Sequence, residues 1–422
     1  MSKRKKEKEI TPPFPAEKKK KSLTIKQAWP VIFLFLLLVF FILHLLTFKD
    51  TDAIFLIREK DEFLSLINLR CFKLGLLIVM NAAILAFVLT YIPIRIISIL
   101  SSTGLWILLF FYSGEMYLSI FPPSQGNNEA YISKIWFKRY WETNKYGFRD
   151  KDYMLDELKY KKKDLIVFLG DSYIAGHGIN DPKDRTADIL ETALKTDYYL
   201  INTGINGIGT LKEFSILKGF PLRPKVIILS HVSNDIEEIL PQEESYAAAY
   251  QQTESNLSIF LFSNSRNSIL GDLLYHYIKQ LVFASRQQVT NTNSPETKNA
   301  FHEWYKVDTI FNQHLKNIKR ISDYSIDSLH AKFILVTYPE GGGKEIDSTD
   351  IYINRKIINS LAHRNNFYTL NVTPIFRRFK PNDRIVNFLD GHPSKKINQL
   401  VADTLIQLIT SPDFKKQPPA MP

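Results

Sequence analysis

A serine at the end of a short apolar run is the first residue of this sequence that could do covalent chemistry. The run at 165–169 follows three lysines and leads into Gly170-Asp171-Ser172 and a glycine-containing turn. An apolar run of this length, bounded by turn residues, is typical of a buried strand. Ser172 is therefore expected at the carboxyl end of a strand, where open α/β sheets place their reacting groups.

A base for this serine is available near the C-terminal end of the chain. Asp390 and His392, separated by one glycine, come directly before a helical pattern at 395–409. A serine hydroxyl becomes a nucleophile when a base takes its proton, and that base needs an acceptor to orient it. Histidine and aspartate are residues of these two types.

Two polar turns could supply hydrogen-bond donors to a developing negative charge. The apolar run at 198–201 leads into a turn that ends with Gly207, and the run at 226–230 leads into a turn that contains Asn234. Backbone N–H groups in glycine turns and asparagine amides are donor types that an oxyanion hole uses.

These four blocks, in this order, resemble the SGNH (GDSL-type) hydrolases and acyltransferases of the membrane-anchored bacterial type. The resemblance covers about 145–409 and extends to an upstream Asn-x-x-Gly-Phe-Arg stretch at 144–149. It implies an α/β fold, a three-layer α/β/α domain with a flavodoxin-like parallel sheet, and serine-dependent chemistry on ester bonds.

The resemblance also implies a role for each residue of the site. Ser172 is the nucleophile, His392 is the base and Asp390 orients the base. The oxyanion hole consists of the backbone N–H groups of Ser172 and Gly207 and the side-chain amide of Asn234.

The chain departs from the family pattern at two positions. Val232 stands where the third block usually has glycine, which affects the backbone room beside Asn234 rather than the donor itself. The last block is Asp-x-His instead of the frequent Asp-x-x-His, a shorter spacing that occurs in members that handle acyl groups on envelope polysaccharides.

Apolar runs alternate with helical patterns from residue 164 onward, which predicts βαβ units and a parallel sheet. Strands are expected at 164–169, 198–201, 225–230, 332–337 and 367–370, and helices near 184–195, 210–218, 303–323 and 353–365. An insertion at 241–302, polar at both ends and apolar in the middle, interrupts the alternation. It could overhang the site or form helices that pack away from it.

Two apolar tracts precede this region. The tract at 31–48 is long enough to span a bilayer, and no small-residue cleavage site follows it. The tract at 74–112 is too long for one crossing and is interrupted by Pro93 and Arg95, which predicts a hairpin of two helices. The sequence thus indicates about three transmembrane helices; the alternative for the second tract is one membrane helix followed by an interfacial one.

Charge predicts the orientation. The chain has 422 residues and a formal net charge of +11; ten Lys or Arg and three Glu lie within residues 1–26, which puts +7 in this tail. The positive-inside rule keeps such a tail in the cytoplasm, and three crossings then place residues from about 113 onward outside it, with the protein in the inner membrane. The remaining +4 over the rest of the chain is not a nucleic-acid-binding profile.

Composition and pattern together divide the chain into five expected regions. These are a basic disordered cytoplasmic tail at 1–28, a membrane region at 29–112, a lead-in segment at 113–160, an SGNH hydrolase-like domain at 161–410 and a C-terminal tail at 411–422.

No cofactor or metal is expected. The one cysteine, Cys71, cannot form an intrachain disulfide, and no Cys/His cluster is visible. The glycines at 204–209 are in the wrong order for a dinucleotide loop, and the glycine run before Lys344 lacks the Ser/Thr of a phosphate-binding loop. His177, Asp171 and Asp235 are given no catalytic role.

The sequence therefore predicts a membrane-anchored serine esterase that acts on an extracytoplasmic acyl ester, such as an acylated glycan or lipid, with the lipid bilayer as its other partner. Two alternatives remain open: an O-acyltransferase that modifies an envelope polysaccharide, and an SGNH-like protein that binds an envelope polymer without catalysis.

Overall fold

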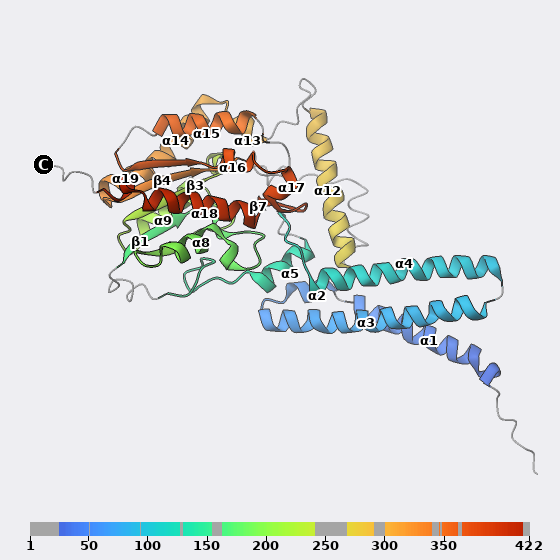
Figure 1. Ribbon diagram of the computed structural model, residues 1–422. Coiled ribbons are helices and arrows are strands. Elements are labelled where there is room, and N and C mark those ends of the chain that lie inside the picture. Colours follow the sequence, from blue (N-terminus) through green and yellow to red (C-terminus); the bar gives the residue numbers. More distant parts are fainter. Residues whose placement is uncertain are drawn as a thin grey trace, which may run out of the picture.

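The computed structural model describes residues 25–49, 51–92, 94–126, 130–153, 163–240, 268–290, 300–339, 346, 348–361 and 365–416. The expected basic tail up to residue 24, Pro93 of the expected hairpin and residues 241–267 and 291–299 of the expected insertion lie outside these ranges. A group of long helices forms one part of the molecule, and an α/β part follows it (Figure 1).

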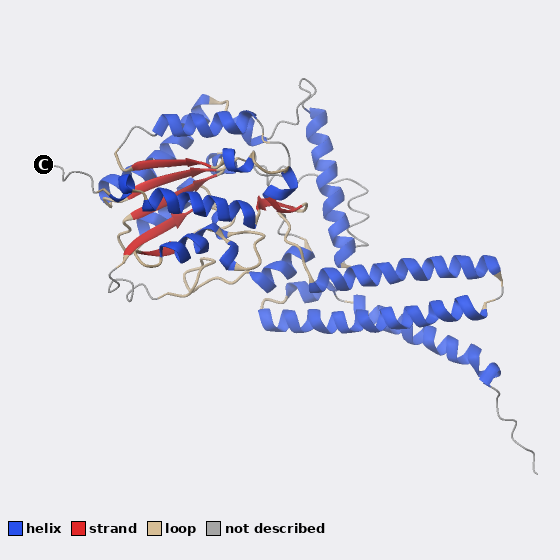
Figure 2. Ribbon diagram, viewed as in Figure 1, coloured by secondary structure: helices blue, strands red, loops and turns tan. Residues whose placement is uncertain are grey.

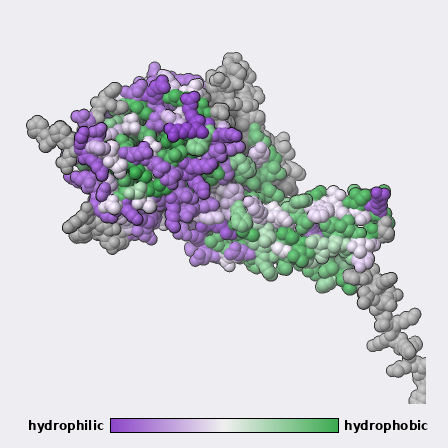
Figure 3. All heavy atoms as spheres, in the orientation of Figure 1, coloured by the Kyte–Doolittle hydropathy of each residue, from purple (hydrophilic) through white to green (hydrophobic). Residues whose placement is uncertain are grey.

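Three N-terminal helices are long and apolar enough to cross a membrane. They are α1 (Ile25–Phe48), α3 (Lys60–Tyr91) and α4 (Arg95–Ile120), and α3 and α4 run side by side (Figure 1). Their surface is strongly apolar (Figure 3), and the side chain of Val79 on α3 is 67% exposed. Contiguous exposed apolar surface of this size marks contact with lipid or protein. The expected set of three long apolar helices is confirmed.

Helix α3 begins at Lys60, well before the apolar tract expected from residue 74, and the charge of Arg70 that it buries in this extension is compensated. The Arg70 guanidinium lies 2.9 Å from the Glu115 carboxylate of α4, and both side chains are buried. Arg70 also donates to the hydroxyl of Thr51 over 2.6 Å. A charge that is paired and hydrogen-bonded can be buried within a helix bundle. Two short helices, α2 (Thr51–Leu56) and α5 (Tyr131–Tyr140), pack at this end through the stacked rings of Phe55 and Tyr131.

The α/β part is built on a five-stranded sheet in the order β2-β1-β3-β4-β5, with every neighbouring pair parallel. Figure 2 shows the strands pointing the same way. The strands are β1 (Asp164–Leu169), β2 (Tyr198–Asn202), β3 (Val226–His231), β4 (Lys332–Thr337) and β5 (Phe367–Asn371). All five expected strands are present, and the predicted α/β parallel sheet is confirmed. Strands covered on both faces read as continuous apolar runs, and β3 is buried along its whole length.

Helices cover both faces of the sheet and make the three layers. Val167 and Leu169 belong to one core, which also contains residues of α9 (Thr210–Gly219), α14 (Asp308–Asp323) and α15 (Ser348–Leu361). Ile166 and Phe168 point to the other core, shared with α8 (Thr186–Leu194) and α18 (Lys395–Thr410). This alternation follows from the two-residue period of a strand. The helix expected at 303–323 is divided, since α13 (Ala300–Trp304) is separate from α14.

The remaining elements are short, apart from one helix. A two-stranded antiparallel ribbon, β6 (Ile385–Asn387) and β7 (Asp390–Pro393), follows the sheet. The short helical segments are α7 (Ser172–Ala175), η1 (Pro182–Asp184), η2 (Ser233–Ile239), η4 (Tyr324–Ser328), α16 (Thr373–Phe376), α17 (Pro381–Arg384) and α19 (Pro412–Lys415). The described part of the insertion forms α12 (Ile269–Thr290), which packs against the bundle rather than over the sheet (Figure 1).

Candidate active site

The serine lies where the sequence predicts, at the carboxyl end of β1 and at the first residue of α7. Gly170 makes this turn possible: a Cβ there would lie 2.6 Å from Ile174 Cγ1 and 2.9 Å from Ser230 Cβ. The Asp171 carboxylate accepts a hydrogen bond from the backbone N–H of Tyr173 over 2.9 Å and so caps α7. Asp171 thus holds the turn that presents Ser172.

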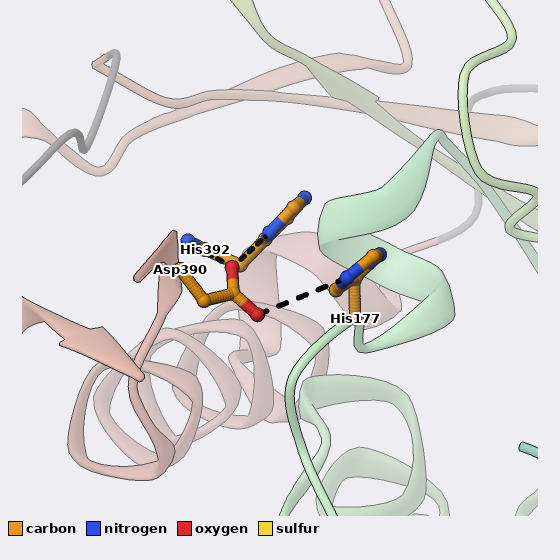
Figure 4. A group of neighbouring side chains, drawn as sticks. All are labelled: His177, Asp390 and His392. Carbon is orange, nitrogen blue, oxygen red and sulfur yellow. Dashed lines mark hydrogen bonds and ion pairs between the residues drawn. The ribbon is translucent and has the colours of Figure 1, made fainter. Parts of the chain in front are cut away.

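Three side chains form a continuous hydrogen-bonded chain. His392 Nε2 is 2.8 Å from Ser172 Oγ, and His392 Nδ1 is 2.5 Å from Asp390 Oδ1. Figure 4 shows the Asp390 carboxylate beside the His392 ring. Asp390 and His392 are two residues apart on β7, and residues at this spacing point to the same side of a strand. The Asp-x-His spacing therefore brings the two side chains together because they lie on a strand.

The charges in this chain favour a basic histidine. Burial alone would lower the pKa of His392, but the charge of Asp390 and its hydrogen bond outweigh burial and raise that pKa above the usual value. Burial would raise the pKa of Asp390, but the charge of His392 and the same hydrogen bond hold it well below its usual range. Asp390 thus stays ionised and stabilises the imidazolium that forms when His392 takes a proton.

His177, to which sequence reasoning gave no role, lies directly behind this base. Its ring stacks on the His392 ring with centroids 4.4 Å apart and planes 7° from parallel, and its other face stacks on Trp136 at 5.4 Å. Its Nδ1 is 2.9 Å from the Asn206 amide nitrogen, and its Nε2 is 3.1 Å from the Gln125 carbonyl oxygen. Burial lowers the pKa of His177 to about 4, so the ring is neutral, accepts at Nδ1 and donates from Nε2.

His177, Asp390 and His392 bring three potential metal ligands within 4.8 Å of one another. Their geometry does not suit a metal ion. The lone pair of a ring nitrogen lies in the plane of its ring, and the two imidazoles are stacked face to face (Figure 4). Stacked rings cannot both direct in-plane lone pairs at one ion at the roughly 2 Å that zinc requires. The cluster fits an oriented base better than a metal centre.

The two expected oxyanion donors follow neighbouring strands at the same edge of the sheet. Gly207 has a φ of 70°, in a turn tied to the serine loop by a hydrogen bond from the Ile205 N–H to the Gly170 carbonyl over 3.2 Å. Asn234 lies in the first turn of η2, directly after β3, the strand that pairs with β1 and thus with the serine loop at its end. The structure thus brings both turns to the loop that carries the serine.

The valine in the third block is compatible with this turn. Val232 has a φ of −124°, an extended conformation that any residue adopts, and its side chain is buried in the core. Its N–H donates to the Asp235 carboxylate over 3.0 Å, so Asp235 orients the turn that carries Asn234.

The lead-in stretch clamps the serine loop from outside the sheet. The Asn144 carboxamide oxygen accepts from the N–H groups of Tyr146 and Phe148 and shapes this segment. Arg149 donates to the carbonyl of Ile179 over 2.6 Å and to that of Gly176 in the turn after α7. These contacts give the upstream Asn-x-x-Gly-Phe-Arg stretch a structural role in holding the turn that presents the serine.

The next residue extends this clamp to the second strand. The Asp150 carboxylate accepts from the N–H of Asn202, the last residue of β2, over 3.0 Å. Burial raises the pKa of Asp150 to about 6, against that hydrogen bond. Burial likewise lowers the pKa of Arg149 to about 9.

No protein-family model matches this chain, and no curated protein matches it. Solved structures do. One is described as belonging to a lipolytic G-D-S-L family and comes from Desulfitobacterium hafniense; it is 13% identical, covers 58% of this chain and 99% of its own, and has a TM-score of 0.35. A lipase/acylhydrolase from Enterococcus faecalis is 13% identical, with 58% and 95% covered and a TM-score of 0.32.

A third similar structure is a carbohydrate acetylesterase family member from Sinorhizobium meliloti, which is 13% identical, with 58% and 97% covered and a TM-score of 0.28. This chain is similar in structure to these three proteins over 58% of its length.

Proposed function

We propose that this chain is a membrane-anchored serine esterase of the SGNH type. The observation that carries the proposal is the hydrogen-bonded chain from Ser172 through His392 to Asp390, with contacts of 2.8 Å and 2.5 Å. A nucleophile within reach of a base, and a base held by an orienting carboxylate, are the parts that acyl transfer through serine requires.

In the proposed reaction, His392 Nε2 takes the proton of Ser172 Oγ as this oxygen attacks the ester carbonyl. The carbonyl oxygen becomes an oxyanion that accepts hydrogen bonds from the Ser172 and Gly207 N–H groups and the Asn234 amide. His392 then gives its proton to the departing alcohol, which leaves an acyl-serine. Water, deprotonated by His392, releases the acyl group and restores the serine. A sugar hydroxyl in place of water would make the same site an O-acyltransferase.

We also propose a role for each region of the chain. Residues 29–112 anchor the protein in the inner membrane, 113–160 lead to the catalytic region, and 161–410 carry the chemistry outside the cytoplasm, where envelope esters such as acylated glycans or lipids lie. Three long apolar helices support this arrangement, because an odd number of crossings places the two ends on opposite sides.

Active-site labelling tests the chemistry. The full chain in detergent is incubated with a fluorophosphonate probe, and the modified residue is mapped by mass spectrometry. We expect one labelled peptide, with the adduct on Ser172, and no adduct in Ser172→Ala. Labelling of another serine, or none in a folded protein, contradicts the nucleophile assignment. An SGNH-like domain that only binds a polymer would give the unlabelled result.

Reporter fusions test the orientation. Alkaline phosphatase, which needs an oxidising compartment for its disulfides, is fused after residue 126 or at the C-terminus. We expect both fusions to be active and the matching cytoplasm-dependent fluorescent fusions to be dark. The reverse pattern contradicts the three-crossing arrangement without touching the triad.

A further inference from the structure

Helix α12 exposes an apolar stripe and buries charged side chains, unlike a typical helix on the surface of a soluble domain. Its exposed face carries the apolar and aromatic side chains Leu274, Tyr277 and Leu281, which are 50%, 45% and 52% exposed. Its buried face carries the polar side chains Asp272, His276 and Lys279 together with Ile269 and Tyr275. A surface helix in water normally buries its apolar stripe and exposes its polar one. The exposed stripe, at positions i, i+3 and i+7, therefore requires an apolar neighbour.

The start of α12 is fixed to the helix bundle. The Glu115 carboxylate of α4 accepts hydrogen bonds from the Ser268 hydroxyl over 2.5 Å and from the N–H groups of Ile269 and Leu270 over 3.2 Å and 2.7 Å. Glu115 thus caps α12 while it pairs with Arg70 of α3. Asp272, in the first turn of α12, accepts from the N–H of Tyr131 on α5 over 2.6 Å.

This anchor lies at the level where a bilayer core would end. From Tyr91, the last residue of α3, back to Arg70 the helix rises about 31 Å at 1.5 Å per residue. The hydrocarbon core of a bilayer is about 30 Å thick. If the core begins at the hairpin end of α3, its other boundary falls beside Arg70, where α12 begins.

Helix α12 then runs across the direction of α3 and α4 rather than along it (Figure 1). A helix that crosses membrane-spanning helices in this way lies along the plane of the membrane. Figure 3 shows apolar surface over α12 next to the apolar surface of the bundle. The two surfaces together fit one continuous lipid phase.

We infer that α12 is an interfacial helix whose face of Leu274, Tyr277 and Leu281 lies in the lipid surface on the side of the α/β part. The occupant is lipid rather than a second protein because the stripe continues the surface of the bundle and begins at the bilayer boundary. Tyrosine is enriched in this zone, where its ring contacts lipid and its hydroxyl contacts water. The inference rests on the proposed membrane anchoring and extends it to the position of the catalytic part.

The catalytic ribbon is tied to the same level of the membrane. Helix α4 ends at Ile120, and the chain directly after it holds the ribbon: the Asn387 amide donates to the Ser124 carbonyl over 3.1 Å, and the Gly126 N–H donates to the Leu389 carbonyl over 3.0 Å. The four residues from Ile120 to Ser124 span at most about 14 Å. The carboxyl ends of the strands also point toward α12 and the bundle (Figure 2). The site thus faces the bilayer surface, and we expect it to take esters presented there.

Spin labels on the full chain in phosphatidylethanolamine–phosphatidylglycerol vesicles test the lipid contact. The background is Cys71→Ala, which removes the single native thiol, and labels are placed at Leu274→Cys and Leu281→Cys. Val79→Cys on α3 is the lipid-exposed control, and Tyr352→Cys on α15, which is 60% exposed, is the water-exposed control. We expect oxygen to relax the α12 labels more than a water-soluble nickel chelate does, as at Val79 and opposite to Tyr352.

Three other outcomes of the spin-label experiment lead to different conclusions. Labels on α12 that behave like Tyr352, while Val79 behaves as lipid-exposed, overturn the inference and leave the membrane anchoring intact. Labels on α12 that neither reagent reaches overturn it in favour of a protein partner. A water-like label at Val79 overturns the anchoring itself, and the inference falls with it.

A charged variant tests the consequence for the site. In Leu274→Asp/Leu281→Asp we expect unchanged hydrolysis of a short water-soluble ester in detergent, and reduced hydrolysis of a long-chain fluorogenic ester held in the same vesicles. Tyr352→Asp is the matched control and should change neither rate. Equal rates of vesicle-ester hydrolysis in the variant and the wild type overturn the role of α12 at the site. Wild-type protein that hydrolyses neither ester contradicts the proposed esterase but leaves the spin-label result standing.

Discussion

Two histidines in the α/β part, each paired with another polar side chain, have opposite chemistry. His392 pairs with the carboxylate of Asp390, whereas His231, the last residue of β3, pairs with His314 of α14 through Nε2 atoms 2.9 Å apart. Burial lowers the pKa of His231 and lowers that of His314 to about 3, while the pKa of His392 is raised. Burial alone therefore favours the neutral form of a histidine, and a neighbouring buried carboxylate raises the pKa of such a histidine.

Exposure separates the two pairs as well. The side chain of His392 is 16% exposed, which leaves an approach to Ser172, whereas His231 and His314 are fully buried. The hydroxyl of Tyr305 lies 3.2 Å from His231 Nε2 and closes that cluster with a polar contact. The His231–His314 pair is thus a sealed internal contact, and the His392–Asp390 pair opens onto the Ser172 hydroxyl.

The largest effect is expected from Ser172→Ala. Loss of the nucleophile in a serine triad typically lowers kcat by about 10⁶-fold. Hydrolysis of a short-chain acyl ester should fall by this order, while the thermal unfolding midpoint stays nearly unchanged because only one partly buried hydroxyl is removed. Activity within about tenfold of the wild type, far above that expectation, means that Ser172 is not the nucleophile.

Asp390→Asn removes the carboxylate beside His392. The pKa of His392 should then be set by burial, as it is for His231 and His314. The loss of an orienting carboxylate in a triad typically lowers kcat by about 10⁴-fold. His392 acts when neutral, so activity rises with pH through its pKa. Without the Asp390 charge, burial dominates and that pKa falls, so the acid limb of the pH–kcat/KM profile should move to lower pH.

Asp383→Asn is the control for this change, because the exposed Asp383 side chain pairs only loosely with Lys396, at 3.9 Å. It should alter neither the rate nor the pH profile. An unmoved acid limb in Asp390→Asn would show that Asp390 does not set the basicity of His392.

Asn234→Ala should have the next largest effect. The amide acts on charge that exists only in the transition state, and removal of one such donor typically costs about 10²–10³ in kcat. Steady-state kinetics on the same ester should show the loss in kcat with little change in KM. A change confined to KM would place Asn234 in substrate binding instead.

His314→Gln should have the smallest effect on catalysis. It leaves His231 without its ring partner, which we expect to cost about 1–3 kcal/mol of unfolding free energy. Its kcat and acid limb should match the wild type. A neutral buried histidine stabilises the fold above the pKa of the unfolded chain and loses that contribution as pH falls toward its own pKa, so chemical denaturation should show a weaker acid destabilisation in His314→Gln. A shifted acid limb in His314→Gln would show that the His231–His314 pair influences the pKa of His392.

Much of the fold follows from local pattern. The five strands are continuous apolar runs between polar turns, and their order along the chain predicts a parallel sheet. The polar β6–β7 ribbon gives no such signal, because Asp390-Gly391-His392-Pro393 reads as a turn. The beginning of α3, before residue 74, could not be predicted from local pattern either, because Arg70 is compensated by Glu115 on another helix.

Only those site residues that belong to the four sequence blocks could be predicted. Ser172, His392, Asp390, Gly207 and Asn234 follow from four sequence blocks. The position of His177 does not, because the groups that hold it, Trp136 and Gln125, come from the lead-in segment. The only hint in the sequence is that His177 lies between two glycines, Gly176 and Gly178, which is typical of a sharp turn. In the structure both glycines adopt a positive φ.

The contact at Glu115 also bears on the order in which the chain assembles. Its carboxylate is fully buried and meets its partners only when α3, α4 and α12 are together, since Arg70 and the first residues of α12 supply the donors. Alone, a buried unpaired charge is strongly unfavourable. Helices α3 and α4 come before α12 in the chain and already pair the Glu115 charge with Arg70, so α12 adds the last hydrogen-bond donors to this junction. We therefore expect the contact between α12 and the helix bundle to form late, after α3 and α4 have come together.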